Sequence, residues 1–236
     1  MSIGISETVP GLRPRLRLLN GFDLQQGGHH LVLRPASERL LAFLALADKS
    51  IERATVAYRL WPDKPEGRAI ANLRSALWRI RQLAADLIEA TTTHIRLHPA
   101  VWVDARDGLA ELKHHDPETL CDEVEGMALQ GELLPDWYDD WLLTERERLR
   151  QLRLHALEEA VRVLIDRDRL SAAIDLGLRA VAMEPLRESS HRLVIRAHLC
   201  EGNRAEAIRQ YQACAHLLQE ELGVPPSTQM TALLAL

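Results

Sequence analysis

Cysteines are few in this 236-residue sequence, and it contains no long apolar run. Cys121, Cys200 and Cys214 are far apart, and none belongs to the C-x-x-C spacing that often binds metal. We therefore expect buried, reduced thiols. No apolar stretch approaches the roughly 20 residues that cross a bilayer, and the first twenty residues lack the apolar core of a signal peptide. The sequence thus predicts a cytoplasmic protein that does not contact a membrane.

Charge divides unevenly along the chain, although the net charge is only −5. Residues 1–105 contain 14 Lys and Arg against 10 Asp and Glu, whereas residues 106–236 contain 15 against 24. A basic front half and an acidic back half predict two domains with different partners. The acidic half would repel phosphates, so we expect any nucleic acid to bind the front half.

Short alternating segments open the front half, beginning at Leu16 and Leu18, and predict a small antiparallel sheet after a flexible tail over residues 1–13. A helix is predicted to start at Ser37 and a second to run from about Ile51 to Trp61. Pro62 ends the second helix, because proline disfavours a helical conformation at the residue before it.

A third helix is predicted from Arg68 to about Leu87, with one narrow apolar stripe that contains Leu73, Leu77, Ile80, Ala84 and Leu87. No acidic residue occurs between Glu66 and Asp86. The helix therefore offers an uncharged and cationic side to an anionic partner. Trp78 lies toward this side, and we expect it to pack on the wing or on a neighbouring helix, with contact to a DNA base as the alternative.

Residues 91–97 and 101–103 are β-prone and are predicted to pair as a ribbon that turns at His98-Pro99. Sheet, three helices and closing ribbon form a winged helix-turn-helix over residues 14–105. Residues 106–236 are rich in helix formers, with a helix predicted over Ala105–Leu112 and a break at Asp116-Pro117.

An internal repeat with a period of 34 residues occupies the second half. Ala173-Ile174 corresponds to Ala207-Ile208, Ala180 to Cys214, and Asp168 to Gly202. This period is typical of tetratricopeptide helix pairs. The predicted fold class is mainly α with a small β component, a winged helix-turn-helix followed by an all-α tetratricopeptide-like domain. The residues expected to line the concave side of the repeats are His155, Glu158, Arg162, Arg192 and Arg196.

The order of these parts resembles the SARP family of transcriptional activators, which join an OmpR-type winged helix to a bacterial transcriptional activation domain. The matching segments are Leu60-Trp61-Pro62, residues 72–81, Trp102-Val103-Asp104, Tyr138-Asp139-Asp140-Trp141, residues 145–149, residues 184–188 and residues 221–227. The resemblance implies promoter binding by two copies on direct repeats and recruitment of RNA polymerase subunits. One departure is Thr91-Thr92-Thr93, which stands where a Gly-rich wing turn is common.

The chemistry of the third helix suits the major groove, where base edges carry a readable hydrogen-bond pattern. The candidate DNA-binding residues are Arg68, Asn72, Arg74, Ser75, Arg79, Arg81 and Gln82, with Thr92, His94 and Arg96 on the wing. Arg79 is placed mid-face to read guanine, and Asn72 could read adenine or hold a phosphate. The remaining arginines suit phosphates, which give affinity rather than sequence choice.

No enzyme, metal or cofactor site is predicted. His29-His30 and His114-His115 are adjacent pairs that rarely point at one ion, and Asp139-Asp140 lies in an aromatic setting typical of packing. No nucleophile has a neighbouring base. Two hypotheses besides the transcription regulator stay open: a repeat-type adaptor whose winged helix binds protein, and a hydrolase or transferase that uses scattered His and Asp.

Overall fold

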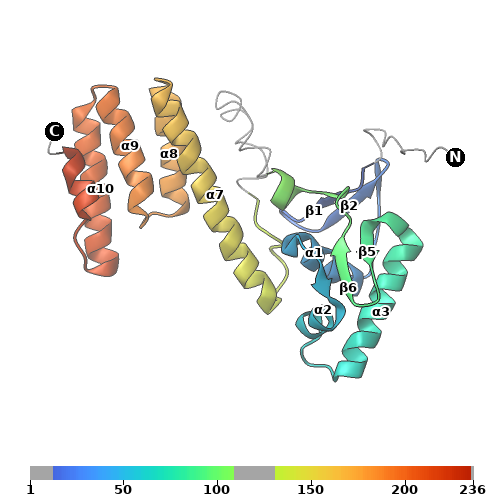
Figure 1. Cartoon of the computed structure of the whole chain (residues 1–236). Coiled ribbons are helices and arrows are strands. Elements are labelled where there is room, and N and C mark those ends of the chain that lie inside the picture. The colour runs from blue at the N-terminus through green and yellow to red at the C-terminus, as the bar shows by residue number, and fades with distance from the viewer. Residues whose placement is uncertain (1–12, 109–130, 235–236) are drawn as a thin grey trace. The chain divides into compact units, whose positions relative to one another are not determined.

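The computed structural model describes residues 13–108 and 131–234 (Figure 1). Of these, residues 13–108 and 131–147 form one compact unit, and residues 148–234 form a second. Cys121, the pair His114-His115 and the expected helix break at Asp116-Pro117 lie outside the described residues. Among the described residues, no helix combines the length and the apolar character that crossing a membrane requires.

The first unit begins with a small sheet whose strand order is β3-β2-β1-β7. Its strands are β1 (Arg15–Arg17), β2 (Asp23–Gln26), β3 (His29–His30) and β7 (Trp102–Val103). The leading strands pair antiparallel, as predicted, with Leu16 opposite Leu24. Leu16, Leu18 and Leu24 are buried, which accounts for the alternating pattern of this region.

The second sheet has the order β4-β6-β5 and forms the wing, from β4 (Ile51–Glu52), β5 (Ile88–Ala90) and β6 (His94–Leu97). The predicted ribbon was wrong in its pairing. β6 pairs with β5, and the turn lies at Thr91–Thr93 rather than at His98-Pro99. β7 instead runs parallel to β1, with Val103 opposite Leu16; the intervening helices and wing supply the long connection that a parallel pair requires.

The helices of the first unit are α1 (Pro35–Ala47), α2 (Arg53–Leu60) and α3 (Glu66–Leu83), followed by a 3-10 turn (Ala85–Leu87). The predicted second helix loses its first two residues to β4. The third helix ends four residues earlier than predicted, because Ala84 is extended at φ −154°. Ala84 and Leu87 are nevertheless buried, as the apolar stripe required.

Asp104 joins the two ends of the winged-helix sequence. It lies in a short π-helical turn (Asp104–Gly108), where the expected helix over 105–112 begins, and its carboxylate is buried. The Oδ1 atom accepts hydrogen bonds from the backbone N–H of Leu18 at 2.8 Å and of Ala105 at 2.7 Å, and Oδ2 accepts one from Leu19 at 3.1 Å. Burial raises the pKa of Asp104, although these three donors act in the opposite direction.

Residues 131–147 pack within the first unit. Leu133 forms an antiparallel bridge with Leu19, and the N–H of Leu134 donates to the carbonyl of Leu18 at 2.9 Å. The Arg146 guanidinium donates to the carbonyls of Leu133 at 2.9 Å and of Trp137 at 3.0 Å, and so fixes the loop between them. The division of the chain into domains at residue 105 stays a prediction; this segment belongs by contact to the preceding unit.

The second unit consists of antiparallel helices that pack side by side (Figure 1). They are α7 (Asp140–Asp166), which begins in the first unit, α8 (Leu170–Met183), α9 (Glu188–Cys200), α10 (Arg204–Leu222), α11 (Thr228–Thr231) and a 3-10 turn (Ala232–Leu234).

The 34-residue period corresponds to one helix pair, α7 with α8 and α9 with α10. Asp168 and Gly202 occupy equivalent turns and both have positive φ, at 58° and 83°. Ala173 and Ala207 are both fully buried where the helices cross. The small residues at the repeat positions therefore permit close helix packing, as the period predicted.

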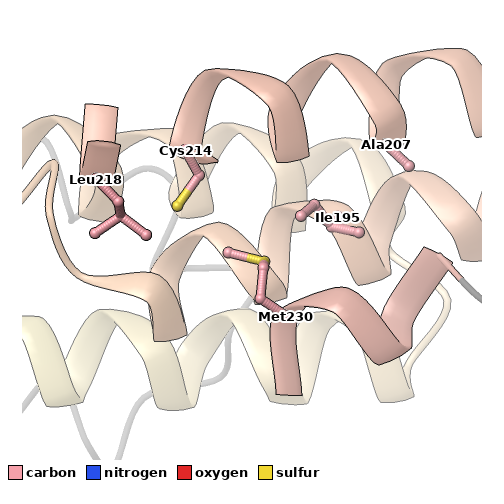
Figure 2. Close-up of a cluster of buried hydrophobic side chains, with 5 residues drawn as sticks. All are labelled: Ile195, Ala207, Cys214, Leu218 and Met230. Carbon is pink, nitrogen blue, oxygen red and sulfur yellow. The ribbon is translucent and has the colours of Figure 1, made fainter. Parts of the chain in front are cut away.

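A buried cluster fills the end of the second unit (Figure 2). Its members are Ile195, Ala207, Cys214, Leu218 and Met230. Burial raises the pKa of the Cys214 thiol to about 11, so this thiol is protonated near neutral pH. Cys200, in contrast, is exposed at the end of α9, so the expectation of buried thiols was wrong for it.

Glu158 was predicted to line a concave groove but is buried, with 2% of its surface exposed. It accepts hydrogen bonds from Arg187 and from the hydroxyl groups of Ser189 and Ser190. The spacing of a repeat predicts which residues share a face. It does not predict that residues at the start of α9 cover this carboxylate and shield it from solvent. Arg162, Arg196 and His155 are exposed, as a surface position requires.

Candidate nucleic-acid interface

Helix α3 is held in place by one apolar side. Its buried residues are Ala69, Leu73, Ala76, Leu77 and Ile80, which recur at helical spacing and face α1 and α2. The helix begins directly after Pro65, whose φ of −52° suits a helix entry. The stiff loop from Pro62 to Pro65 therefore sets the position at which α3 leaves α2.

The opposite side of α3 is exposed and has small or uncharged residues along its middle. Ala71, Ser75, Trp78 and Gln82 follow one another at intervals of three or four residues, so they lie on one line along the helix. All four are exposed. Small side chains at Ala71 and Ser75 would allow the backbone of α3 to approach a ligand closely.

Arginines lie on both edges of this line. Arg74 and Arg81 are exposed on one edge, and Arg68, Asn72 and Arg79 share the other. Arg79 was expected at mid-face, but the structure places it and Asn72 half-buried at that edge.

The guanidinium groups of α3 have no counter-charge among residues 13–108 and 131–234. The guanidinium groups of Arg68, Arg74, Arg79 and Arg81 form no ion pair or hydrogen bond with the described part of the chain. Elsewhere, surface arginines such as Arg162 and Arg209 pair with glutamates of their own helix. The edges of α3 therefore keep their full positive charge for an external anion.

The wing carries less free charge than the sequence indicated. Arg96 donates its Nε–H to Glu89 on the neighbouring strand at 2.5 Å, and the pKa of Glu89 is lowered by this hydrogen bond. Thr92 and His94 are exposed at the turn. Of the predicted wing residues, these two are the ones available for a phosphate.

Sequence reasoning missed Arg53, which orders the wing turn. Its guanidinium Nη1 donates to the carbonyl of Thr91 at 3.1 Å, and its backbone N–H donates to Thr93 at 2.8 Å. The hydroxyl of Thr91 also accepts the N–H of His94 at 2.9 Å. Threonine thus closes the turn by side-chain hydrogen bonding where glycine would do so through backbone freedom. Arg53 stands at the first position of α2, and no local signal assigns it to the wing.

The sites that were set aside have structural roles. Asp139 pairs with Arg39 of α1, whose guanidinium also donates to the carbonyl of Leu60 at 3.0 Å. Trp141 packs edge-on against Phe43, with ring centroids 5.2 Å apart. The Nδ1 atom of His30 lies 2.6 Å from Oδ1 of Asp23. Within residues 13–108 and 131–234, no group of three potential metal ligands occurs.

Comparison with known proteins gives consistent matches. Residues 101–235 match the model of the family described as bacterial transcriptional activator domain. The regulatory protein AfsR of Streptomyces griseus is 25% identical over 231 residues, which cover 92% of this chain and 23% of that protein. AfsR of Streptomyces coelicolor is 28% identical over 218 residues, covering 81% and 21%. The chain spans less than a quarter of the length of these curated relatives.

A solved structure shares the fold. Mycobacterium tuberculosis EmbR in complex with a low affinity phosphopeptide aligns with a TM-score of 0.75 at 20% identity, covering 94% of this chain and 64% of that one. The predicted fold class, a winged helix-turn-helix followed by a tetratricopeptide-like helical domain, is therefore confirmed.

Proposed function

Since this chain belongs to the bacterial transcriptional activator domain family, and with it to the SARP family of transcriptional activators, we propose that it binds promoter DNA by inserting α3 into the major groove. The family is one of transcription regulators rather than of enzymes. DNA binding and the contacts that activate transcription are the proposal.

The observation that carries this proposal is the pair of arginine edges on α3. Arg74 and Arg81 on one side and Arg68 on the other are exposed and free of ion pairs among the described residues, and uncharged side chains lie between them. The major groove is complementary to this arrangement, because base edges lie along its middle and phosphates lie along both of its sides. An α-helix fits this groove in width.

The edge and the centre of α3 take different roles. Arg68, Arg74 and Arg81 bind phosphates, which set affinity and register but carry no sequence information. Ser75 and Gln82 face the base edges. Arg79 and Asn72 lie half-buried at the same edge as Arg68, and we assign them to the bases of the DNA strand on that side of the groove. The Arg79 guanidinium is suited to O6 and N7 of guanine. On the wing, Thr92 and His94 contact the backbone, while Arg96 stays paired with Glu89.

The second unit supplies protein contacts. Residues 106–236 contain 15 Lys and Arg against 24 Asp and Glu, but the acidic excess lies in residues 106–147, with 3 against 13, whereas residues 148–236 are nearly neutral, with 12 against 11. Stacked helix pairs present extended surfaces that bind proteins. We assign to this half the contact with RNA polymerase subunits and with a second copy on direct repeats.

Gel-shift titration of the full chain against fragmented genomic DNA of its source tests the proposal. The wild type should retain specific fragments with an affinity that falls steeply as salt rises. Arg79→Ala should lose the preference for those fragments. Arg209→Ala, which removes an exposed arginine on α10, serves as the matched control and should bind like the wild type.

Equal, salt-insensitive binding by the wild type and Arg79→Ala would contradict the proposal. The adaptor hypothesis makes the opposite forecast: a stable protein partner would co-purify with the chain, and no DNA would be retained at low salt. The charge of the arginine edges favours DNA over this alternative.

A further inference from the structure

Trp78 differs from the other tryptophans of this protein in being exposed. It has 62% of its surface open to solvent, against the expectation that it packs on the wing or a neighbouring helix. Trp137 stacks on Phe22, Trp141 packs on Phe43, and Trp102 lies under the Arg15 guanidinium at 4.4 Å. These three side chains stabilise the first unit, whereas the indole of Trp78 is exposed and can contact an external ligand.

The surroundings of Trp78 indicate what that ligand is. Arg74 lies one turn before it and Arg81 nearly one turn after it, while Ser75 and Gln82 lie on its other side. An exposed apolar patch for a protein partner would have apolar neighbours, and here the neighbours are cationic or polar. The ligand must therefore be polyanionic and must also present an apolar group close to its charges.

The major groove of DNA presents one such group. The C5-methyl of thymine is the apolar feature among the hydrogen-bonding groups of the base edges, and apolar side chains distinguish T·A pairs by contacting it. Phosphates line both sides of the groove, within reach of arginines at the edges of the same helix.

We propose that Trp78 is a specificity-determining residue that contacts thymine C5-methyl groups in each half-site of the operator. This inference rests on the proposed function and adds to it the base that the middle of α3 selects. It requires a thymine at the positions of each half-site that face the middle of α3. The contact is uncharged, so it raises specificity without changing the number of ions released on binding.

The test replaces single thymines by uracil, which removes the methyl group and leaves every hydrogen-bonding atom of the base edge in place. An operator is first selected with the full-length wild type. Each thymine of one half-site is then replaced in turn, and dissociation constants are measured for the wild type, Trp78→Ala, Trp78→Phe and Leu83→Ala. Leu83 is the matched control, because it is an apolar residue 42% exposed near the end of α3, away from the middle line.

We expect the wild type to lose about fourfold in affinity at one or two thymines, the effect of one buried methyl group. Trp78→Ala should bind the intact operator more weakly and show no loss at those thymines. Trp78→Phe should keep part of the discrimination, and Leu83→Ala should match the wild type. The slope of affinity against salt should be the same for Trp78→Ala and the wild type.

Three outcomes would overturn the inference: Trp78→Ala retains the uracil effect, it binds as tightly as the wild type, or it alters only the cooperative binding of a second copy. The last outcome would make Trp78 a protein contact. Failure of the proposed function has a different signature, because the wild type would then select no operator. Unfolding curves of the exposed-site variants should overlay the wild type, so a loss of affinity is not a loss of fold.

Discussion

Arg187 donates Nε to one oxygen of Glu158 and Nη2 to the other, at 2.8 and 3.2 Å, in a bidentate pair. Glu158 lies on α7, and Arg187 immediately precedes α9, so the pair ties the first helix of one repeat to the start of the next. Ser190 adds a hydroxyl donor at 3.0 Å. Ser189 also donates to this carboxylate, and Arg162 lies 3.8 Å from it. A buried carboxylate is stabilising only while its hydrogen-bond donors stay engaged.

Glu158→Gln should lower the free energy of unfolding by about 1–3 kcal/mol, because the amide presents a donor to groups that are themselves donors. Chemical denaturation measures this effect. Glu159→Gln is the control, since Glu159 is exposed and its one ion pair among the described residues is with Arg162 of its own helix. A loss in the control equal to that in Glu158→Gln would show that the buried pair has no special role.

The same carboxylate predicts a dependence on pH. Burial would raise the pKa of Glu158, but the hydrogen bonds from Arg187, Ser189 and Ser190 outweigh it and lower the pKa from its ordinary 4.5 to about 2. Its contribution to stability is therefore fully present above pH 4.5 and is lost as pH falls toward 2. The stability difference between the wild type and Glu158→Gln should shrink across this window.

Gly177 of α8 lies where two helices cross. A Cβ at this position would meet the Cγ2 of Val194 at 2.7 Å. Gly177→Ala should destabilise the second unit by about 1–3 kcal/mol, because a packed core resists an added methyl group. Gly67→Ala is the opposite case: no atom lies within 4 Å of its Cβ position. It should stabilise α3 by about 0.5–1 kcal/mol through helix propensity. Thermal unfolding measures both changes, and equal shifts in the midpoint for Gly177→Ala and Gly67→Ala would contradict these predictions.

The Asp104 carboxylate should contribute to the stability of the first unit. Asp104→Asn leaves one oxygen and an amide donor facing the N–H groups of Leu18, Leu19 and Ala105, and we expect a loss of about 1–3 kcal/mol. Asp86→Asn, at an exposed position, should have little effect on the denaturation midpoint. Hydrogen exchange should also show faster exchange at the amides of Leu18 and Leu19 in Asp104→Asn.

The arginine edge predicts a specific change in salt dependence. Removing one phosphate contact by Arg74→Ala should lower the slope of log affinity against log salt by about 1, and Arg81→Ala should do the same. The loss should be similar on specific and random DNA, since phosphates carry no sequence information. Arg209→Ala should leave the slope unchanged; a slope that fell equally in that control would remove α3 from the interface.

Local patterns were enough for much of the architecture. The apolar stripe of α3, the end of α2 at Pro62 and the 34-residue repeat all depend on neighbours within a few turns, and each was predicted. Asp168 and Gly202 show how far such reasoning reaches, because a match in sequence position became a match in backbone conformation. The choice of α3 as the charged surface likewise followed from an acid-free stretch of sequence.

Long-range contacts decided the rest. The pairing of β7 with β1, the burial of Asp104 against Leu18, and the packing of residues 131–147 in the first unit join residues about 86 to 115 positions apart, which no periodicity encodes. The same holds for side chains whose environment depends on where another helix passes. Glu158 was expected in a groove and is buried, whereas Trp78 was expected to pack on the wing or a neighbouring helix and is exposed. Sequence thus determined which faces exist, and tertiary packing determined which of them are covered.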